Sequence, residues 1–105
     1  MSGQLVLAEL EAFRSVLGKA QRREGETVTA WCRSTITNAV HRVGPTGPIK
    51  AAAEAVWTAA DQLARALDGD SSDADLEAAR EAAVGAVDAL IVTVREIKAA
   101  GSNAV

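Results

Sequence analysis

The sequence predicts an all-α protein, folded as an antiparallel up-down-up-down four-helix bundle, and three observations support this. Alanine, the best helix former, supplies 23 of the 105 residues, whereas Tyr is absent and aromatic residues make up 3%. Turn-forming Gly and Pro residues divide the chain into four stretches. Within each stretch, apolar residues recur at alternating spacings of three and four, as they do on a helix with one buried face.

The first two stretches predict helices over residues 4–24 and 27–43. The apolar stripe of the first consists of Val6, Leu10, Phe13, Leu17 and Ala20, and Gly25 follows as a residue typical of a helix end. The stripe of the second consists of Val28, Cys32, Thr35, Ile36, Ala39 and Val43. The strongest break in the chain, Gly44-Pro45-Thr46-Gly47-Pro48, follows this helix.

The last two stretches predict helices over residues 48–68 and 73–100, with a short polar tail at 101–105. Pro48 fits the first position of the third helix, whose stripe consists of Ile49, Ala53, Val56, Ala60, Leu63 and Leu67. Ser72, with Asp75 three residues later, resembles a capping box at the start of the fourth helix. The fourth stripe consists of Leu76, Ala79, Ala83, Val87, Leu90, Val94 and Ile97, and it is widened by Val84, Ala86 and Ile91.

Short links between these helices force consecutive helices to run antiparallel, which gives a single helical domain over residues 1–105. Alanine permits close approach of the helix axes but fills little volume, so we expect a thin core. A dimer of helical hairpins would use the same apolar stripes, and the periodicity does not distinguish it from a single-chain bundle.

The composition excludes several kinds of protein. A single cysteine, Cys32, cannot form an internal disulfide, and one Cys with one His cannot supply the usual zinc, haem or di-iron ligands. We therefore expect no metal and no cofactor. No apolar run reaches the ~18 residues of a membrane span. No N-terminal segment has the pattern of a signal peptide, so we expect a cytoplasmic protein. The abundance of Ala, Val and Arg indicates a GC-rich bacterial gene.

The sequence contains no catalytic constellation, so we expect a protein that is not an enzyme. Cys32 and His41 are the one pair that could act as a thiol nucleophile and its base. They are nine residues apart, and a helix turns about 100° per residue, so they lie on opposite faces. The acidic residues fit helix capping and solvated helix faces better than general acid–base pairs. The Gly- and Pro-rich break lacks the residues of a phosphate-binding loop.

The most specific pattern is a stripe along one edge of the second helix, beside its apolar face. It consists of Trp31, Thr35, Asn38 and Arg42 at helical spacing, and Trp57 lies at the border of the third stripe. Because interfaces favour Trp and Arg as anchors, we interpret these five residues as candidate partner-binding residues. The alternative interpretation is an inter-helix polar network, with the Trp rings covering a thin core.

Charge is unevenly distributed along the chain. Residues 1–50 hold seven Lys or Arg and four Asp or Glu, whereas residues 51–105 hold four and ten. The basic half could meet an acidic partner or nucleic acid, or it could face the acidic half within the bundle or in a second copy. The net charge of −3 argues against nucleic acid, because nucleic-acid-binding domains are usually basic.

The sequence therefore predicts a non-catalytic protein–protein interaction or assembly module, whose partner is another protein or a second copy of the chain. Two other functions stay open. One is a nucleic-acid-associated regulator that uses the basic N-terminal half. The other is a small-ligand sensor or enzyme with a pocket near Trp31, Thr35 and Asn38.

Overall fold

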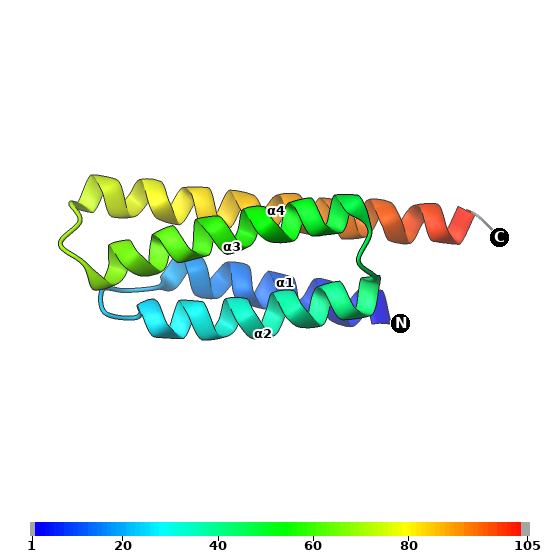
Figure 1. Ribbon diagram of the computed structural model, residues 1–105, viewed down its shortest axis with the longest axis horizontal. Helices are drawn as coiled ribbons and strands as arrows, with labels where there is room; N and C mark the ends of the chain where they lie inside the picture. The colour runs from blue at the N-terminus through cyan, green and yellow to red at the C-terminus, as the bar shows by residue number, and fades with distance from the viewer. Residues whose placement is uncertain (1, 104–105) are drawn as a thin grey trace.

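Four helices occupy the part of the chain that the computed structural model describes, which comprises the backbone of residues 2–103 and the side chains of residues 5–99 (Figure 1). They are α1 (Ser2–Lys19), α2 (Gly25–Val43), α3 (Gly47–Asp68) and α4 (Asp73–Asn103), and no strand occurs within this range. The predicted all-α fold class is therefore confirmed.

The helices form an antiparallel up-down-up-down bundle. Each helix packs on its neighbours in the chain, and α1 also packs on α4, which closes the ring. In Figure 1, α1 and α2 form one layer and α3 and α4 form the other, with the α1–α2 turn and the α3–α4 turn at the same end. The resulting rod measures 52 × 18 × 18 Å. One chain supplies all four helices of the core, as the single-chain alternative requires.

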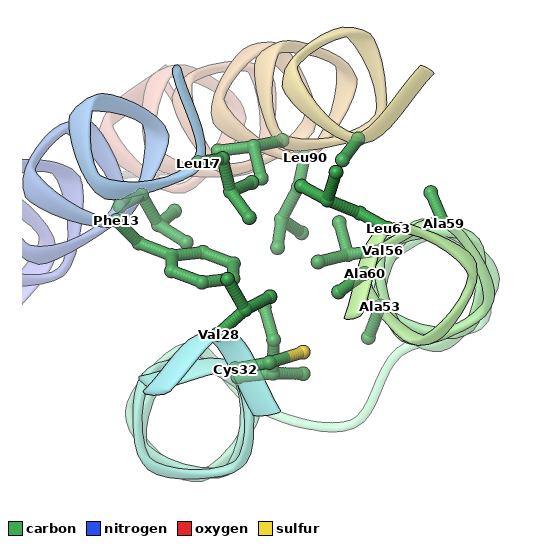
Figure 2. Close-up of a cluster of buried hydrophobic side chains, with 14 of the residues drawn as sticks. Phe13, Leu17, Val28, Cys32, Ala53, Val56, Ala59, Ala60, Leu63 and Leu90 are labelled. Atoms are coloured by element: carbon green, nitrogen blue, oxygen red, sulfur yellow. The ribbon is translucent and has the colours of Figure 1, made fainter. Parts of the chain in front are cut away.

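The four apolar stripes meet in one core that runs along the rod. Figure 2 shows side chains from different helices, among them Phe13, Leu17, Val28 and Leu63, pointing toward one another. Phe13 is the one aromatic side chain among the buried residues that the structure describes, and the other large ones are Leu, Ile and Val. Full burial of each such side chain stabilises the fold by about 1.5–3 kcal/mol relative to exposure, so the stripes hold the helices together.

Alanine lines the contact between α3 and α4. On α3, Ala52, Ala59 and Ala66 recur every seven residues along the edge of the stripe that points away from α2. On α4, Ala79 and Ala86 have the same spacing, and all five side chains are buried or partly buried. Because each of them is a single methyl group, the two helix axes can approach closely and gain dispersion contacts without large side chains.

The predicted helix over residues 4–24 is wrong at its C-terminal end, because α1 stops before the last five of these residues. Arg23 adopts a φ of 73°, in the left-handed region. Its backbone N–H donates to the carbonyl of Leu67 in α3 at 2.9 Å. The carboxylate of Glu24 accepts a hydrogen bond from the backbone N–H of Gln21 at 2.7 Å. A tertiary hydrogen bond and a local one therefore form a turn from residues that favour a helix.

The other helix bounds lie close to the predicted ones. Gly25 is the first residue of α2 rather than a residue beyond the end of α1, so this helix begins before residue 27. The last helix continues to Asn103, past its predicted end at residue 100. Residues 104–105 of the predicted polar tail lie outside the described residues.

Local side-chain caps start the last two helices as the sequence predicts. The hydroxyl of Thr46 accepts the backbone N–H of Ile49 at 3.4 Å, and Pro48 lies in the first turn of α3. The hydroxyl of Ser72 accepts the backbone N–H of Asp75 at 3.1 Å, ahead of α4. Each cap satisfies one of the backbone donors that a helix N-terminus leaves without an intrahelical partner.

The start of α2 is capped by another helix. No side chain of the preceding residue caps it. Instead Oδ1 of Asp68, at the end of α3, accepts the backbone N–H of Gly25 at 3.0 Å. A Cβ at residue 25 would overlap the Asp68 carboxylate and lie 2.6 Å from the carbonyl oxygen of Ala64. This close approach requires glycine, and the carboxylate also complements the positive end of the α2 dipole.

Gly25→Ala should lower the free energy of unfolding by about 1–2 kcal/mol, because the new Cβ displaces the Asp68 carboxylate from the α2 N-terminus. Gly85→Ala is the matched control, since a Cβ there meets no neighbouring atom within 4 Å. Alanine in a helix interior is more stable than glycine by about 1 kcal/mol. Denaturant midpoints of the two variants should shift in opposite directions, and an unchanged midpoint for Gly25→Ala would contradict the inter-helix cap.

Candidate functional site

A groove runs between α1 and α2 on the outside of the bundle, and three of the five predicted site residues line it. It has a volume of about 610 Å³ and is lined by Ala8, Glu9, Ala12, Ala30, Trp31, Ser34, Thr35 and Asn38. We call it the Trp31 groove. Trp31 exposes 42% of its surface, whereas Thr35 is buried and contributes to the floor.

The hollow continues on the other side of Trp31, toward the α1–α2 turn. This second part has a volume of about 360 Å³ and is lined by Ser15, Val16, Lys19, Ala20, Glu24, Thr27, Val28 and Trp31. Trp31 therefore stands between two hollows of one inter-helix groove, and its ring belongs to the wall of both.

A chain of hydrogen bonds joins α1 to α2 beside the groove. The amide nitrogen of Asn38 donates to the carboxylate of Glu9 on α1, and the amide oxygen of Asn38 accepts from Nε of Arg42 at 3.1 Å. Arg42 thus adjoins the groove through Asn38. These contacts are an inter-helix polar network of the kind that the alternative interpretation describes, and they leave the Trp31 ring partly exposed.

None of the five predicted site residues lies on α1, yet α1 forms one wall of the groove. Ala8, Glu9 and Ala12 line it. Leu5, which exposes 47% of its surface, lies four residues before Glu9 and therefore on the same side of α1. A signal for this wall exists in the sequence, because these residues flank the first apolar stripe at helical spacing, as Trp31 flanks the second.

Trp57 lies apart from the other four predicted residues. It exposes 37% of its surface and lines a different groove, of about 680 Å³, between α2 and α3. His41, Lys50 and Glu54 line this second groove as well. The five predicted residues therefore lie along two grooves on either side of α2 and do not form one patch.

Ion pairs occupy part of the basic first half of the chain. Arg14 of α1 pairs with Asp88 of α4 at 2.6 Å, and Arg22 in the α1–α2 turn pairs with Asp73 at 3.1 Å. Among the side chains that the structure describes, no ion pair is formed by Lys19, Arg23, Arg33 or Arg42. Positive charge therefore remains available on the α1 and α2 side of the rod.

Cys32 and His41 do not meet. Cys32 is buried, and Figure 2 shows its side chain within the core, whereas His41 is exposed. Burial raises the pKa of the Cys32 thiol to about 11, so the thiol stays protonated at neutral pH. Within the described residues, no group of three His, Cys, Asp or Glu side chains is placed to hold a metal ion. None of the described helices combines the length and apolarity needed to cross a bilayer.

The fold and the groove define a small four-helix protein with an open, amphipathic groove along one long face. No protein-family model, curated protein or solved structure matches the chain. Its function therefore has to be inferred from the Trp31 groove and the charges around it.

Cys32 should resist iodoacetamide in the folded protein at neutral pH and react rapidly once the chain is unfolded, because only the thiolate attacks. Its pKa lies above the ordinary 9.0 in the folded state. The stabilisation from burying the thiol is therefore complete below pH 9.0 and is lost as the pH rises through about 11. Alkylation rates measured against pH check this. The control is Ser34→Cys in a Cys32→Ala background, and equal rates for the two thiols would contradict the raised pKa.

Proposed function

We propose that this protein is a non-catalytic protein–protein interaction module whose Trp31 groove accepts a helical surface of a protein partner. The observation that carries the proposal is the exposure of Trp31 between two hollows of one groove. The chain has only three aromatic residues, and one of the two Trp rings is left accessible here. Trp is strongly enriched among the residues that dominate the binding energy of protein interfaces.

The shape of the groove favours a helix as the bound element. The walls are built largely from short side chains, among them Ala8, Ala12, Ala30 and Ser34, so a second helix can approach both α1 and α2 closely. Leu5 offers a further apolar contact near the start of α1. Small-ligand sites usually enclose most of their ligand. An open groove along a rod therefore favours a macromolecular partner over the small-ligand alternative.

The groove is held in place before any partner arrives. The hydrogen bond from Asn38 to Glu9 links α2 to α1, and the hydrogen bond from Arg42 within α2 orients the Asn38 amide. The floor is part of the bundle core, where Val28 and Thr35 are buried. Binding therefore needs little ordering of backbone or side chains, and a preorganised surface loses less free energy on association.

The lining also favours protein over nucleic acid. Around the larger hollow, the one charged side chain is the carboxylate of Glu9, whereas a phosphate backbone would require cations there. Arg14 and Arg22 of the basic half are engaged with Asp88 and Asp73 of the same chain. These ion pairs lower the positive charge that the nucleic-acid alternative depends on.

The double variant Trp31→Ala/Arg42→Ala should keep its helical circular-dichroism spectrum and lose partner binding. Both side chains are exposed, so we expect the free energy of unfolding to fall by only about 1–2 kcal/mol. Loss of an interface Trp or Arg commonly costs at least about 2 kcal/mol of binding free energy. Binding is measured by photo-crosslinking from a benzophenone amino acid at Ser34, in extracts of the source cells.

A crosslinker at Glu81, in the groove between α1 and α4, is the positional control. We expect a discrete crosslinked protein from Ser34 that disappears in the double variant, and no such product from Glu81. Unfolding of the double variant would instead support the structural interpretation of Trp31 and Arg42. Equal crosslinking from both positions would show that the Trp31 groove is not the binding site.

A further inference from the structure

We propose that the Trp31 groove binds a second copy of this chain, which presents the outer face of its α3 and α4. This inference rests on the proposed function, since it names the partner of the same groove. Two faces of one chain support this inference because they complement each other. The charges at their ends are opposite, their apolar side chains correspond in position, and both faces run along the rod.

The outer face of α3 and α4 carries no charge over its central part. Its exposed side chains are Ala51, Ala55, Thr58 and Gln62 on α3 and Ala78, Ala82, Ala89 and Val92 on α4. We call this the alanine face. The neighbouring acidic residues line other grooves: Glu54 and Asp61 face the α2 side, and Glu81 and Asp88 face the α1 side. Arg65 lies seven residues after Thr58, at the α2-side border of the face, and its charge is paired with that of Asp61 at 3.0 Å. Val92 exposes 49% of its surface, so the face has a large apolar side chain of its own.

Acidic side chains bound the alanine face at both ends. Asp70 lies in the α3–α4 turn and Asp75 in the first turn of α4. Glu96 lies near the other end, seven residues after Ala89 and therefore on the same side of α4. All three carboxylates are exposed, and none makes an ion pair with a described side chain. The alanine face thus presents an uncharged centre between negative ends.

Cations bound the Trp31 groove at both ends. Lys19 and Arg23 lie at the α1–α2 turn, and Arg42 lies in the last turn of α2. Of the carboxylates near them, Glu24 accepts the backbone N–H of residue 21 and Glu9 accepts the amide of residue 38. Glu26, in the first turn of α2, lines the groove between α2 and α3 instead. The groove therefore presents its Trp ring and short side chains between positive ends, the charge complement of the alanine face.

The charges match in number when two copies stack in parallel. Figure 1 shows the α1–α2 and α3–α4 turns at one end of the rod, where Arg22 donates to the carbonyl of Ser71 at 2.7 Å. In a parallel stack, the two free cations of the α1–α2 turn meet the two free acids of the α3–α4 turn of the next copy. Arg42 meets Glu96 at the other end. Two copies joined through their Trp31 grooves would instead bring cations against cations.

The apolar side chains of the two faces also lie at corresponding distances along the rod in this stack. At about 1.5 Å per residue, Trp31 lies about 9 Å from the start of α2, and Ala78 and Ala82 lie about 8 and 14 Å from the start of α4. Leu5 lies about 21 Å from the end of α1, and Ala89 lies about 24 Å from the start of α4. Each large side chain of the groove therefore meets methyl groups rather than a charge.

The available area is that of a small protein interface. The 18 and 19 residues of α1 and α2 make a face about 28 Å long. At the 18 Å width of the rod this face offers about 500 Å², below the ~800 Å² that a standard interface buries on each partner, so we expect each contact to be weak and dependent on concentration. The Trp31 groove lies between α1 and α2 and the alanine face lies on α3 and α4, and these helix pairs form opposite layers of the bundle (Figure 1). Each copy can therefore use both at once, so the contact is heterologous and builds an open row of copies.

The test measures the mass of the purified protein by sedimentation velocity over a range of concentrations. At low salt we expect the mass to rise with concentration, and added salt should return it toward the monomer mass of 10.8 kDa. The double variant Lys19→Glu/Arg23→Glu reverses the charge at the turn end of the groove. The double variant Asp70→Lys/Asp75→Lys reverses the charge at the turn end of the alanine face. In each variant alone, the groove and the alanine face then carry charges of the same sign and repel each other, so the association constant should fall at least about tenfold.

Mixing the two reversal variants should restore assembly, because the reversed groove of one fits the reversed alanine face of the other. Arg33→Glu/Lys50→Glu and Glu54→Lys/Glu81→Lys are the matched controls. They change the net charge by the same amounts at exposed positions on other faces, and they should assemble as the wild type does. Circular dichroism establishes that all four variants are folded.

Three results would overturn the second copy as partner: a wild-type mass that stays at 10.8 kDa at every concentration, controls that assemble as poorly as the reversal variants, or a mixture that fails to assemble. Crosslinking from Ser34 to a different protein, together with a monomeric purified protein, would reject this inference and leave the proposed function standing. Absence of any crosslinked product from Ser34 would reject both.

Discussion

Burial of one narrow apolar stripe per helix is the constraint on which the rest of the structure depends. Phe13 is the single aromatic side chain of the described core, and alanines fill the contact between α3 and α4. The helices must therefore approach closely to bury enough surface. Large side chains outside the narrow stripes stay out of the core, so Leu5 and Trp31 beside their stripes and Val92 on the outer face of α4 are half exposed. The thin core thus creates the apolar surface on which partner binding is proposed.

Helical spacing predicts burial well in this chain, because each stripe repeats with the helix itself. Cys32 and Thr35 lie in the core where their spacing places them, although neither is a typical core residue. Local pattern fails at residues 20–24, whose composition is as favourable to a helix as that of the residues before them. Contacts with α3 determine the backbone conformation of this segment. They are the backbone hydrogen bond of Arg23 and the close approach of Gly25 to α3. No local spacing encodes either contact.

The candidate site is predicted only in part, and the reason is geometric. Spacing gives the angle of a side chain around its own helix, so it places Trp31 and Trp57 beside their stripes. It does not say which helix lies on that side, because both senses of winding the four helices into a ring satisfy the same stripes. For this reason the sequence did not separate the two Trp residues into different grooves. For the same reason, helical spacing did not predict the contact of Asn38 with Glu9.

The first and last described residues lie at one end of the rod, opposite the α1–α2 and α3–α4 turns (Figure 1). There α4, with 31 residues against 18 in α1, projects beyond the other helices. In the proposed row of parallel copies, the first and last described residues of every copy would lie along a single edge, at a repeat close to the 18 Å width of the rod. Cargo fused to either terminus would be displayed as a regular array on that edge, with the opposite edge left bare. The bundle would then act as a one-sided scaffold.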